Sequence, residues 1–145
     1  MNKHHYVAIM AGGIGSRFWP KSRTGLPKQF LDILNTGKTL IQWTYERYAS
    51  FIPNENIYVV TSQDYEEIVA EQLPLMKREN ILTEPSRKNT APCIAYISYK
   101  LLQKDHEASL IVAPSDHIIL DTATFKEISL KALFFVREIK AILTL

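Results

Sequence analysis

The stretch that decides the fold is YVAIM at residues 6–10, followed directly by AGGIGSR at residues 11–17. The first of these is a short apolar run that predicts a buried β-strand. Three glycines within residues 12–15 let the backbone turn sharply and bring bare N–H groups close to a bulky anion. Arg17 adds a planar, permanently charged fork, and Lys28 adds a second, compact positive charge. A strand that leads into a glycine-rich, basic loop predicts a phosphate-binding site.

Two familiar nucleotide loops do not fit this sequence. The dinucleotide pattern G-x-G-x-x-G fails because Phe18 stands where the third glycine is needed for close helix–strand packing. The tripeptide at residues 37–39, GKT, resembles the end of a P-loop, but Asp32 occupies the place of the first glycine. We therefore interpret residues 37–39 as a turn followed by a helix cap.

Length and composition exclude several classes of protein. The chain has 145 residues, 46% of them apolar, which suffices for one domain with a core. Its 17 basic and 15 acidic residues leave a net charge of +2, which argues against a nucleic-acid binder. A single cysteine, Cys93, excludes an internal disulfide framework. No apolar run approaches the roughly 20 residues that span a bilayer, so we expect a soluble, cytoplasmic protein without a membrane partner.

Hydrophobic patterning predicts alternating strands and helices. We expect strands at residues 6–10, 56–61, 80–84, 109–113 and 141–145, the fourth being the most clearly buried. Helices are expected at residues 39–51, at residues 63–73 after a Ser62 cap, from a Thr90 cap onward, and from a Thr124 cap to about Arg137. This alternation predicts a parallel sheet with helices on both faces. Ligands of such sheets bind beyond the carboxyl ends of the strands.

That edge would gather the polar segments into one site. The predicted loops at residues 12–28, 61–62, 87–92 and 114–117 all follow strands. Asp116 comes directly after a buried strand, so its carboxylate could hold a divalent cation that bridges phosphates. A cap on a nearby N–H group is an equally good interpretation of Asp116 at this point. Asn89 and Thr90 at a helix start could likewise be caps or contacts to a nucleotide.

Three of these segments together resemble a known family. The opening loop resembles the G-G-x-G-[ST]-R signature of the sugar-1-phosphate nucleotidylyltransferases, with Ser16 at the Ser/Thr position, followed by FWPKS at residues 18–22. The stretches RKNTAP at residues 87–92 and APSDH at residues 113–117 are similar to the branch of that family that makes GDP-mannose. The resemblance implies a Rossmann-like three-layer αβα fold with a mostly parallel sheet, of the nucleotide-diphospho-sugar transferase type.

The activity that the resemblance implies is transfer of GMP from GTP to mannose 1-phosphate, which releases pyrophosphate. Arg17 would neutralise the leaving pyrophosphate, and Lys28 would contact the α-phosphate and the incoming sugar phosphate. Asp116 would bind Mg²⁺. The remaining implied contacts to the substrates are Gly12, Gly13, Gly15, Ser16, Asn89, Thr90 and Ser115.

Members of the family are more than twice as long as this chain. The resemblance therefore implies that residues 1–145 are the N-terminal, nucleotide-binding part of a truncated catalytic domain, without the C-terminal β-helix, and weakly active or inactive alone. Two alternatives stay open at this stage: a sister enzyme that uses UTP or dTTP, and a non-catalytic nucleotide-binding module. A homodimer also stays open.

Overall fold

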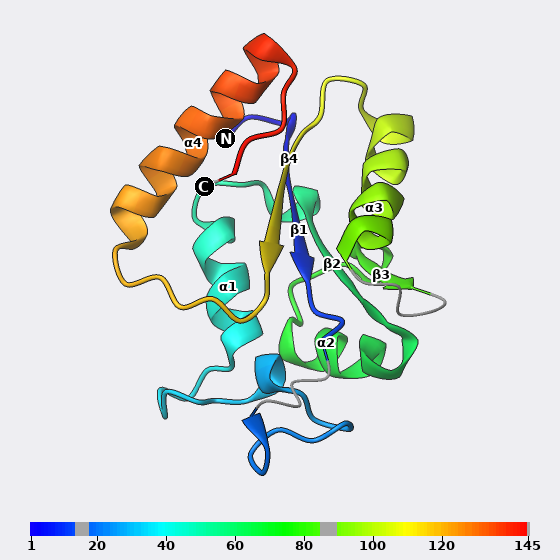
Figure 1. The fold of residues 1–145 in the computed structure, drawn as a ribbon, viewed down its shortest axis with the longest axis vertical. Helices are drawn as coiled ribbons and strands as arrows, with labels where there is room; N and C mark the ends of the chain where they lie inside the picture. Colours follow the sequence, from blue (N-terminus) through cyan, green and yellow to red (C-terminus); the bar gives the residue numbers. More distant parts are fainter. Residues whose placement is uncertain (14–17, 85–89, 145) are drawn as a thin grey trace.

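The computed structural model describes residues 1–13, 18–84 and 90–144. Within them lies one four-stranded sheet in the order β3-β2-β1-β4 (Figure 1). Its strands are β1 (His5–Met10), β2 (Ile57–Ser62), β3 (Ile81–Glu84) and β4 (Ser109–Pro114). All three pairings are parallel, so the carboxyl ends of the strands meet at one edge.

Four α-helices connect and cover the strands in the described residues. They are α1 (Leu40–Ala49), α2 (Glu66–Gln72), α3 (Thr90–Lys104) and α4 (Thr122–Ile139). Short 3₁₀ turns called η2 (Lys28–Phe30), η3 (Asn54–Asn56), η4 (Gln63–Tyr65) and η5 (Arg78–Asn80) lie between these elements. No helix in the described ranges is long and apolar enough to cross a membrane.

The strands divide their side chains between two apolar layers because successive residues of a strand point to opposite faces. In β1, Val7 and Ile9 join the layer that also contains Ile41 of α1, Val69 of α2 and Leu133 of α4. The alternating residues of β1 and β2, Tyr6, Ala8, Tyr58 and Val60, pack in a second layer with Cys93, Ile97 and Leu101 of α3. Figure 1 shows α3 on one side of the sheet and α1 with α4 on the other. The predicted three-layer α/β/α architecture is therefore confirmed.

The predicted capping turn before α1 is also confirmed. The Asp32 carboxylate accepts hydrogen bonds from the backbone N–H groups of Thr36 at 3.1 Å and Gly37 at 2.6 Å. Gly37 has a φ of +82°, a conformation that glycine adopts at little cost. Thr39 then precedes the helix, and its N–H donates to the Gln42 side chain at 2.8 Å. The GKT tripeptide thus turns the chain and begins a helix.

The fifth predicted strand is wrong. Residues 141–144 form no strand, and Lys140 ends α4 in a left-handed conformation with a φ of +50°. Leu143 instead lines an apolar hollow together with Phe134 and Phe135 of α4. A short apolar run can pack on a helix as readily as it pairs with a sheet edge, and periodicity does not distinguish the two.

Two smaller predictions about burial and helix type also need correction. The most buried strand is β2, because β4 lies at the sheet's edge and its residues 110–112 are only half-buried. The helix expected over residues 63–73 begins as the 3₁₀ turn η4 and is α-helical only over Glu66–Gln72.

Two helices begin earlier in the chain than the sequence predicts. Asp121 caps α4, since its carboxylate accepts from the N–H of Thr124 at 2.9 Å, and the helix begins before Thr124. Thr90 is already helical in α3, so it is not the capping residue that the sequence predicts.

The α3 layer provides a test of the core. Leu101 is 2% exposed, whereas the neighbouring Leu102 is 49% exposed. We expect Leu101→Ala to lower the free energy of unfolding by about 2–5 kcal/mol, because it leaves a cavity between α3 and the sheet. Leu102→Ala removes the same atoms from a wet surface and is expected to change stability by less than about 1 kcal/mol. Urea unfolding measures both values, and equal losses would mean that α3 does not pack on the sheet as described.

Candidate nucleotide-binding site

The backbone that follows the strands forms the candidate site at the carboxyl edge of the sheet. The chain leaves β1 through Ala11, whose N–H donates to the carbonyl of Val60 in β2 at 2.8 Å. It leaves β4 through Ser115, whose N–H donates to the carbonyl of Met10 at 3.1 Å. Both loops therefore begin side by side, and the expectation that topology gathers them at one edge agrees with the described structure.

Lys28 and Asp116 meet at this edge although 88 residues separate them. The Lys28 Nζ donates to Asp116 Oδ2 at 3.1 Å. Their side chains are 28% and 38% exposed, so both charges remain within reach of a ligand. Lys28 also lies over the Phe18 ring, with its Nζ 5.2 Å from the ring centroid. Beside the glycine loop, the ammonium group of Lys28 could bind phosphate oxygens and the carboxylate of Asp116 could bind a divalent ion.

Two polar side chains that sequence reasoning missed hold the first residues of the glycine loop. Gln29 is buried, and its Nε2 donates to the carbonyl of Ala11 at 3.0 Å and to that of Gly13 at 2.9 Å. The Thr61 hydroxyl at the end of β2 donates to the same Ala11 carbonyl at 3.0 Å. These hydrogen bonds hold the backbone from Ala11 to Gly13, where the loop begins. The position of Gln29 beside Lys28 in the sequence was the one available signal.

The carboxylate of Glu84, at the end of β3, also lies at this edge of the sheet. A Cβ atom at Gly12 would lie 3.6 Å from Glu84 Oε2, so the side chain contacts the glycine loop directly. Burial raises the pKa of the Glu84 carboxyl above its ordinary value. Burial, and secondarily the charge of Glu84, raises the pKa of the Cys93 thiol in α3 to about 11. The first turn of α3, which exposes Thr90, is therefore close to Glu84.

Not every residue expected in the site can be located. Gly15, Ser16, Arg17 and Asn89 lie outside the described residues. Of the others, Gly12 and Gly13 begin the loop, Ser115 is buried beside β1, and Thr90 opens α3. The described part of the site thus contains the start of the glycine loop, the Lys28–Asp116 pair and Glu84.

The donor set fits a metal ion that is shared with phosphates better than one held by the protein alone. Within residues 1–13, 18–84 and 90–144 no three His, Cys, Asp or Glu side chains group as metal ligands. Mg²⁺ bound with a nucleotide needs only one or two carboxylates, because phosphates and waters complete its shell. The partly exposed carboxylate of Asp116 meets that requirement.

Comparison with known families decides the class. The model of the nucleotidyl transferase family matches residues 6–133, which include β1, the glycine loop, Lys28 and Asp116. The chain belongs to the nucleotidyl transferase family. The matched residues contain the four strands described above, apart from His5 of β1, and the loops at the carboxyl edge of the sheet.

Individual relatives point to one branch of the nucleotidyl transferases. A mannose-1-phosphate guanylyltransferase of Salmonella montevideo is 43% identical over 119 residues, which cover 81% of this chain and 24% of that protein. The alginate biosynthesis protein AlgA of Pseudomonas putida is 44% identical over 116 residues, 78% of this chain and 23% of its own. The chain spans about a quarter of the length of these relatives.

A solved structure supports the fold independently. The Thermus thermophilus protein described as a mannose-1-phosphate geranyltransferase superposes with a TM-score of 0.77 at 34% sequence identity. The match covers 88% of this nucleotidyl transferase chain and 37% of the Thermus chain.

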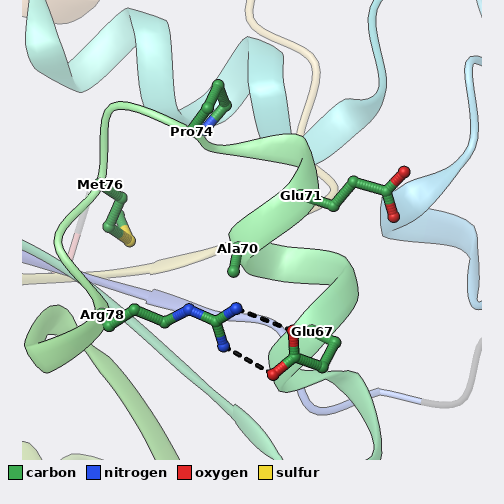
Figure 2. Close-up of a pocket in the computed structure, with 6 residues that line it drawn as sticks. All are labelled: Glu67, Ala70, Glu71, Pro74, Met76 and Arg78. Carbon is green, nitrogen blue, oxygen red and sulfur yellow. Dashed lines mark hydrogen bonds and ion pairs between the residues drawn. The ribbon is translucent and has the colours of Figure 1, made fainter.

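A second hollow on the molecule is separate from the strand edge. Figure 2 shows it between α2 and the segment that leads to β3, lined by Ala70, Glu71, Pro74 and Met76 together with an ion pair. In that pair Arg78 donates to both Glu67 oxygens, at 2.6 and 2.8 Å. None of the described residues at the strand edge lines this hollow, and Glu67 and Arg78 satisfy each other. The hollow therefore adds nothing to the nucleotide site.

Gln29 offers a test of the glycine loop. We expect Gln29→Leu to lower the free energy of unfolding by about 1–3 kcal/mol, because it removes the donor to the Gly13 carbonyl and one of the two donors to the buried Ala11 carbonyl. We also expect it to weaken GTP binding, because the loop loses its support. Gln103→Leu, at an exposed position in α3, is the matched control and should change neither quantity. Urea unfolding and calorimetric GTP titration measure the two effects, and unchanged values in Gln29→Leu would contradict the support.

The raised pKa of Cys93 makes a prediction about reactivity. At pH 9 about half of the thiols of an unfolded chain are thiolates, but a pKa of about 11 leaves about 1% in the folded chain. Native protein should therefore react with iodoacetamide at pH 9 at least tenfold more slowly than protein in urea, as followed by mass spectrometry. Equal rates would refute the burial of the thiol.

The same shift has a consequence for stability. Because the folded pKa lies above the unfolded one, the contribution of the neutral thiol is complete below pH 9 and is lost as pH rises from 9 through 11. Cys93→Ala should flatten that alkaline loss of stability.

Proposed function

We propose that the chain is the nucleotide-binding part of a mannose-1-phosphate guanylyltransferase. The reaction transfers GMP from GTP to mannose 1-phosphate, which gives GDP-mannose and pyrophosphate. The observation that carries the proposal is the Lys28–Asp116 pair beside the glycine loop, in a chain of this family whose relatives include a named mannose-1-phosphate guanylyltransferase.

The chemistry requires positioning and charge stabilisation rather than a protein nucleophile. A phosphate oxygen of mannose 1-phosphate forms a new bond to the α-phosphorus of GTP, and the bond from that phosphorus to the bridging oxygen of pyrophosphate breaks. Negative charge passes to the leaving pyrophosphate, so fixed positive charges on both sides of the α-phosphorus lower the barrier. The buried thiol of Cys93, whose pKa is raised to about 11, is unsuited to nucleophilic attack at neutral pH.

Each site residue has a proposed role in that transfer. Lys28 would bind the α-phosphate and the incoming sugar phosphate, and Arg17 would neutralise the leaving pyrophosphate. The backbone of the glycine loop, at Gly12, Gly13, Gly15 and Ser16, would hold the nucleotide phosphates. Asn89, Thr90 and Ser115 would complete the contacts to the substrates.

Asp116 would hold Mg²⁺, and the positive charge of the bound ion would neutralise part of the negative charge of the phosphates. The contact between Lys28 Nζ and Asp116 Oδ2 keeps this carboxylate at the same place as the proposed phosphate contact. A lysine and a metal-binding carboxylate that meet in this way can act on one triphosphate from two sides.

The preference of the chain for one base is tested by comparing four nucleotides. Calorimetric titrations of the chain with GTP, UTP, dTTP and ATP in Mg²⁺ should show the tightest binding for GTP. Pyrophosphate release with GTP and mannose 1-phosphate then reports whether this chain turns over. Tighter binding of UTP or dTTP would assign a sister enzyme. GTP binding with little or no pyrophosphate release is the result expected of the nucleotide-binding part alone, and full turnover would contradict that expectation.

Asp116 makes the metal prediction. Asp116→Asn should raise the Mg²⁺ concentration for half-maximal GTP binding by more than about tenfold, since even outer-sphere partners of a metal are worth that much. Asp32→Asn makes the same chemical change in the loop before α1 and is the control, expected to leave the Mg²⁺ midpoint unchanged. A wild-type midpoint in Asp116→Asn would remove this carboxylate from the metal site.

A further inference from the structure

The turn that carries Asp116 is held from behind by α1. The carbonyl of Ser115, on one side of Asp116, accepts a hydrogen bond from the Thr44 hydroxyl at 3.2 Å. The carbonyl of His117, on the other side, accepts from both Arg47 Nη1 at 3.1 Å and Arg47 Nη2 at 3.2 Å. The carbonyls of both residues that neighbour Asp116 in the chain are thus bonded to side chains of a single helix.

The two side chains on α1 also bind each other. Arg47 Nη2 donates to the Thr44 hydroxyl oxygen at 3.0 Å, and Thr44 is fully buried. The hydroxyl therefore accepts from the guanidinium and donates to Ser115. Thr44 and Arg47 lie one helical turn apart, so they face the same side of α1.

Arg47 is half-buried against two aromatic rings and has no carboxylate partner among the described residues. Its guanidinium lies 5.7 Å from the ring centroid of Tyr48 and 5.3 Å from that of Phe125 in α4. Burial lowers the pKa of the Arg47 guanidinium, and its Nε is buried without a hydrogen-bond partner in the described structure. Among the described residues no carboxylate pairs with it.

These surroundings indicate that the Arg47 side chain serves to orient the carbonyl of His117. Partial burial of a cation without a carboxylate carries a desolvation penalty, which the aromatic rings and the carbonyl dipole oppose. The planar fork of arginine can bind one carbonyl through two N–H groups and so fix its direction.

We propose that Arg47 is a positioning residue that, together with Thr44, fixes the turn at residues 115–117 so that the Asp116 carboxylate faces the metal–triphosphate complex. The proposal rests on the proposed function, because it assigns Arg47 an effect only through Asp116. Preorganising a ligand in this way avoids the entropy loss of ordering the turn when nucleotide and metal bind. The effect should appear in metal dependence, since Arg47 itself bonds only to backbone and Thr44 in the described structure.

The experiment compares GTP binding to the 145-residue chain by calorimetry at a series of Mg²⁺ concentrations and in EDTA. Arg47→Met keeps an unbranched apolar chain as far as the position of Nε but removes the fork, and Thr44→Val keeps the shape but removes the hydroxyl. Arg47→Lys keeps the charge and removes the bidentate geometry. Arg78→Met is the matched control, because it removes an exposed guanidinium whose hydrogen bonds in the described structure go to Glu67 of α2.

Arg47→Met is expected to raise the Mg²⁺ concentration for half-maximal GTP binding by about 10- to 100-fold, the range for outer-sphere partners of a metal. Thr44→Val should shift the midpoint in the same direction by a smaller factor, and Arg47→Lys should not restore it. GTP affinity in EDTA should stay within about twofold of the wild type in all variants, because the metal-free complex does not use the Asp116 carboxylate as a ligand. Arg78→Met should behave as the wild type.

Several outcomes would overturn the proposal. Restoration by Arg47→Lys would show that charge rather than geometry matters. Equal losses of affinity with and without Mg²⁺, accompanied by a lower melting temperature, would reduce Arg47 to a structural residue. If Arg47→Met does not fold, an unchanged midpoint in Thr44→Val has the same force. Absence of Mg²⁺-dependent GTP binding in the wild-type chain would refute the proposed function, whereas a defect in Asp116→Asn without one in Arg47→Met would refute only this inference.

Discussion

Parallel pairing of β1 with both of its neighbours is the constraint on which the rest of the structure depends. With β2 on one side and β4 on the other, β1 brings together three chain segments whose strands end at the same edge. The register aligns Met10 with Pro114. Asp116 therefore follows the last pair of the ladder by two residues, as Gly12 of the glycine loop does on the other strand. The contact between Lys28 and Asp116 depends on this alignment. A shift of two residues between β1 and β4 would move the carboxylate by about 7 Å and separate it from Lys28.

Buried and half-buried polar side chains support the backbone at this edge from behind. Gln29 binds the carbonyls of the glycine loop, and Thr44 with Arg47 binds the carbonyls on both sides of Asp116. Each of these groups satisfies backbone that cannot pair within the sheet, because the strands have ended there. The Lys28–Asp116 pair at the front of the edge stays partly exposed and so within reach of a ligand. Support from behind and partly exposed charges in front are an arrangement suited to binding a charged ligand without a large rearrangement.

Sequence patterns located the first four strands and the order of the helices because alternation and apolar runs report burial directly. They also located Lys28 and Asp116 near one another, since the edge rule depends only on topology. They did not locate Gln29, Thr44 or Arg47, whose roles depend on carbonyl groups far away in the chain. They misplaced the start of α4, where Asp121 and Thr124 are both good capping residues and only the hydrogen bond between them decides.

The sequence by itself determined the class of fold, the glycine-rich loop after the first strand and the family to which the loop belongs. These follow from local chemistry: β-branched and apolar runs favour strands, and clustered glycines permit the turn. Tertiary structure alone decided which strands are neighbours, that β4 lies at the edge, and that residues 141–144 pack beside α4 instead of extending the sheet. It also decided that Arg47 faces a carbonyl and not a carboxylate. The physical reason is that pairing, burial and hydrogen-bond partners are properties of segments brought together in space, and no single segment encodes its partner.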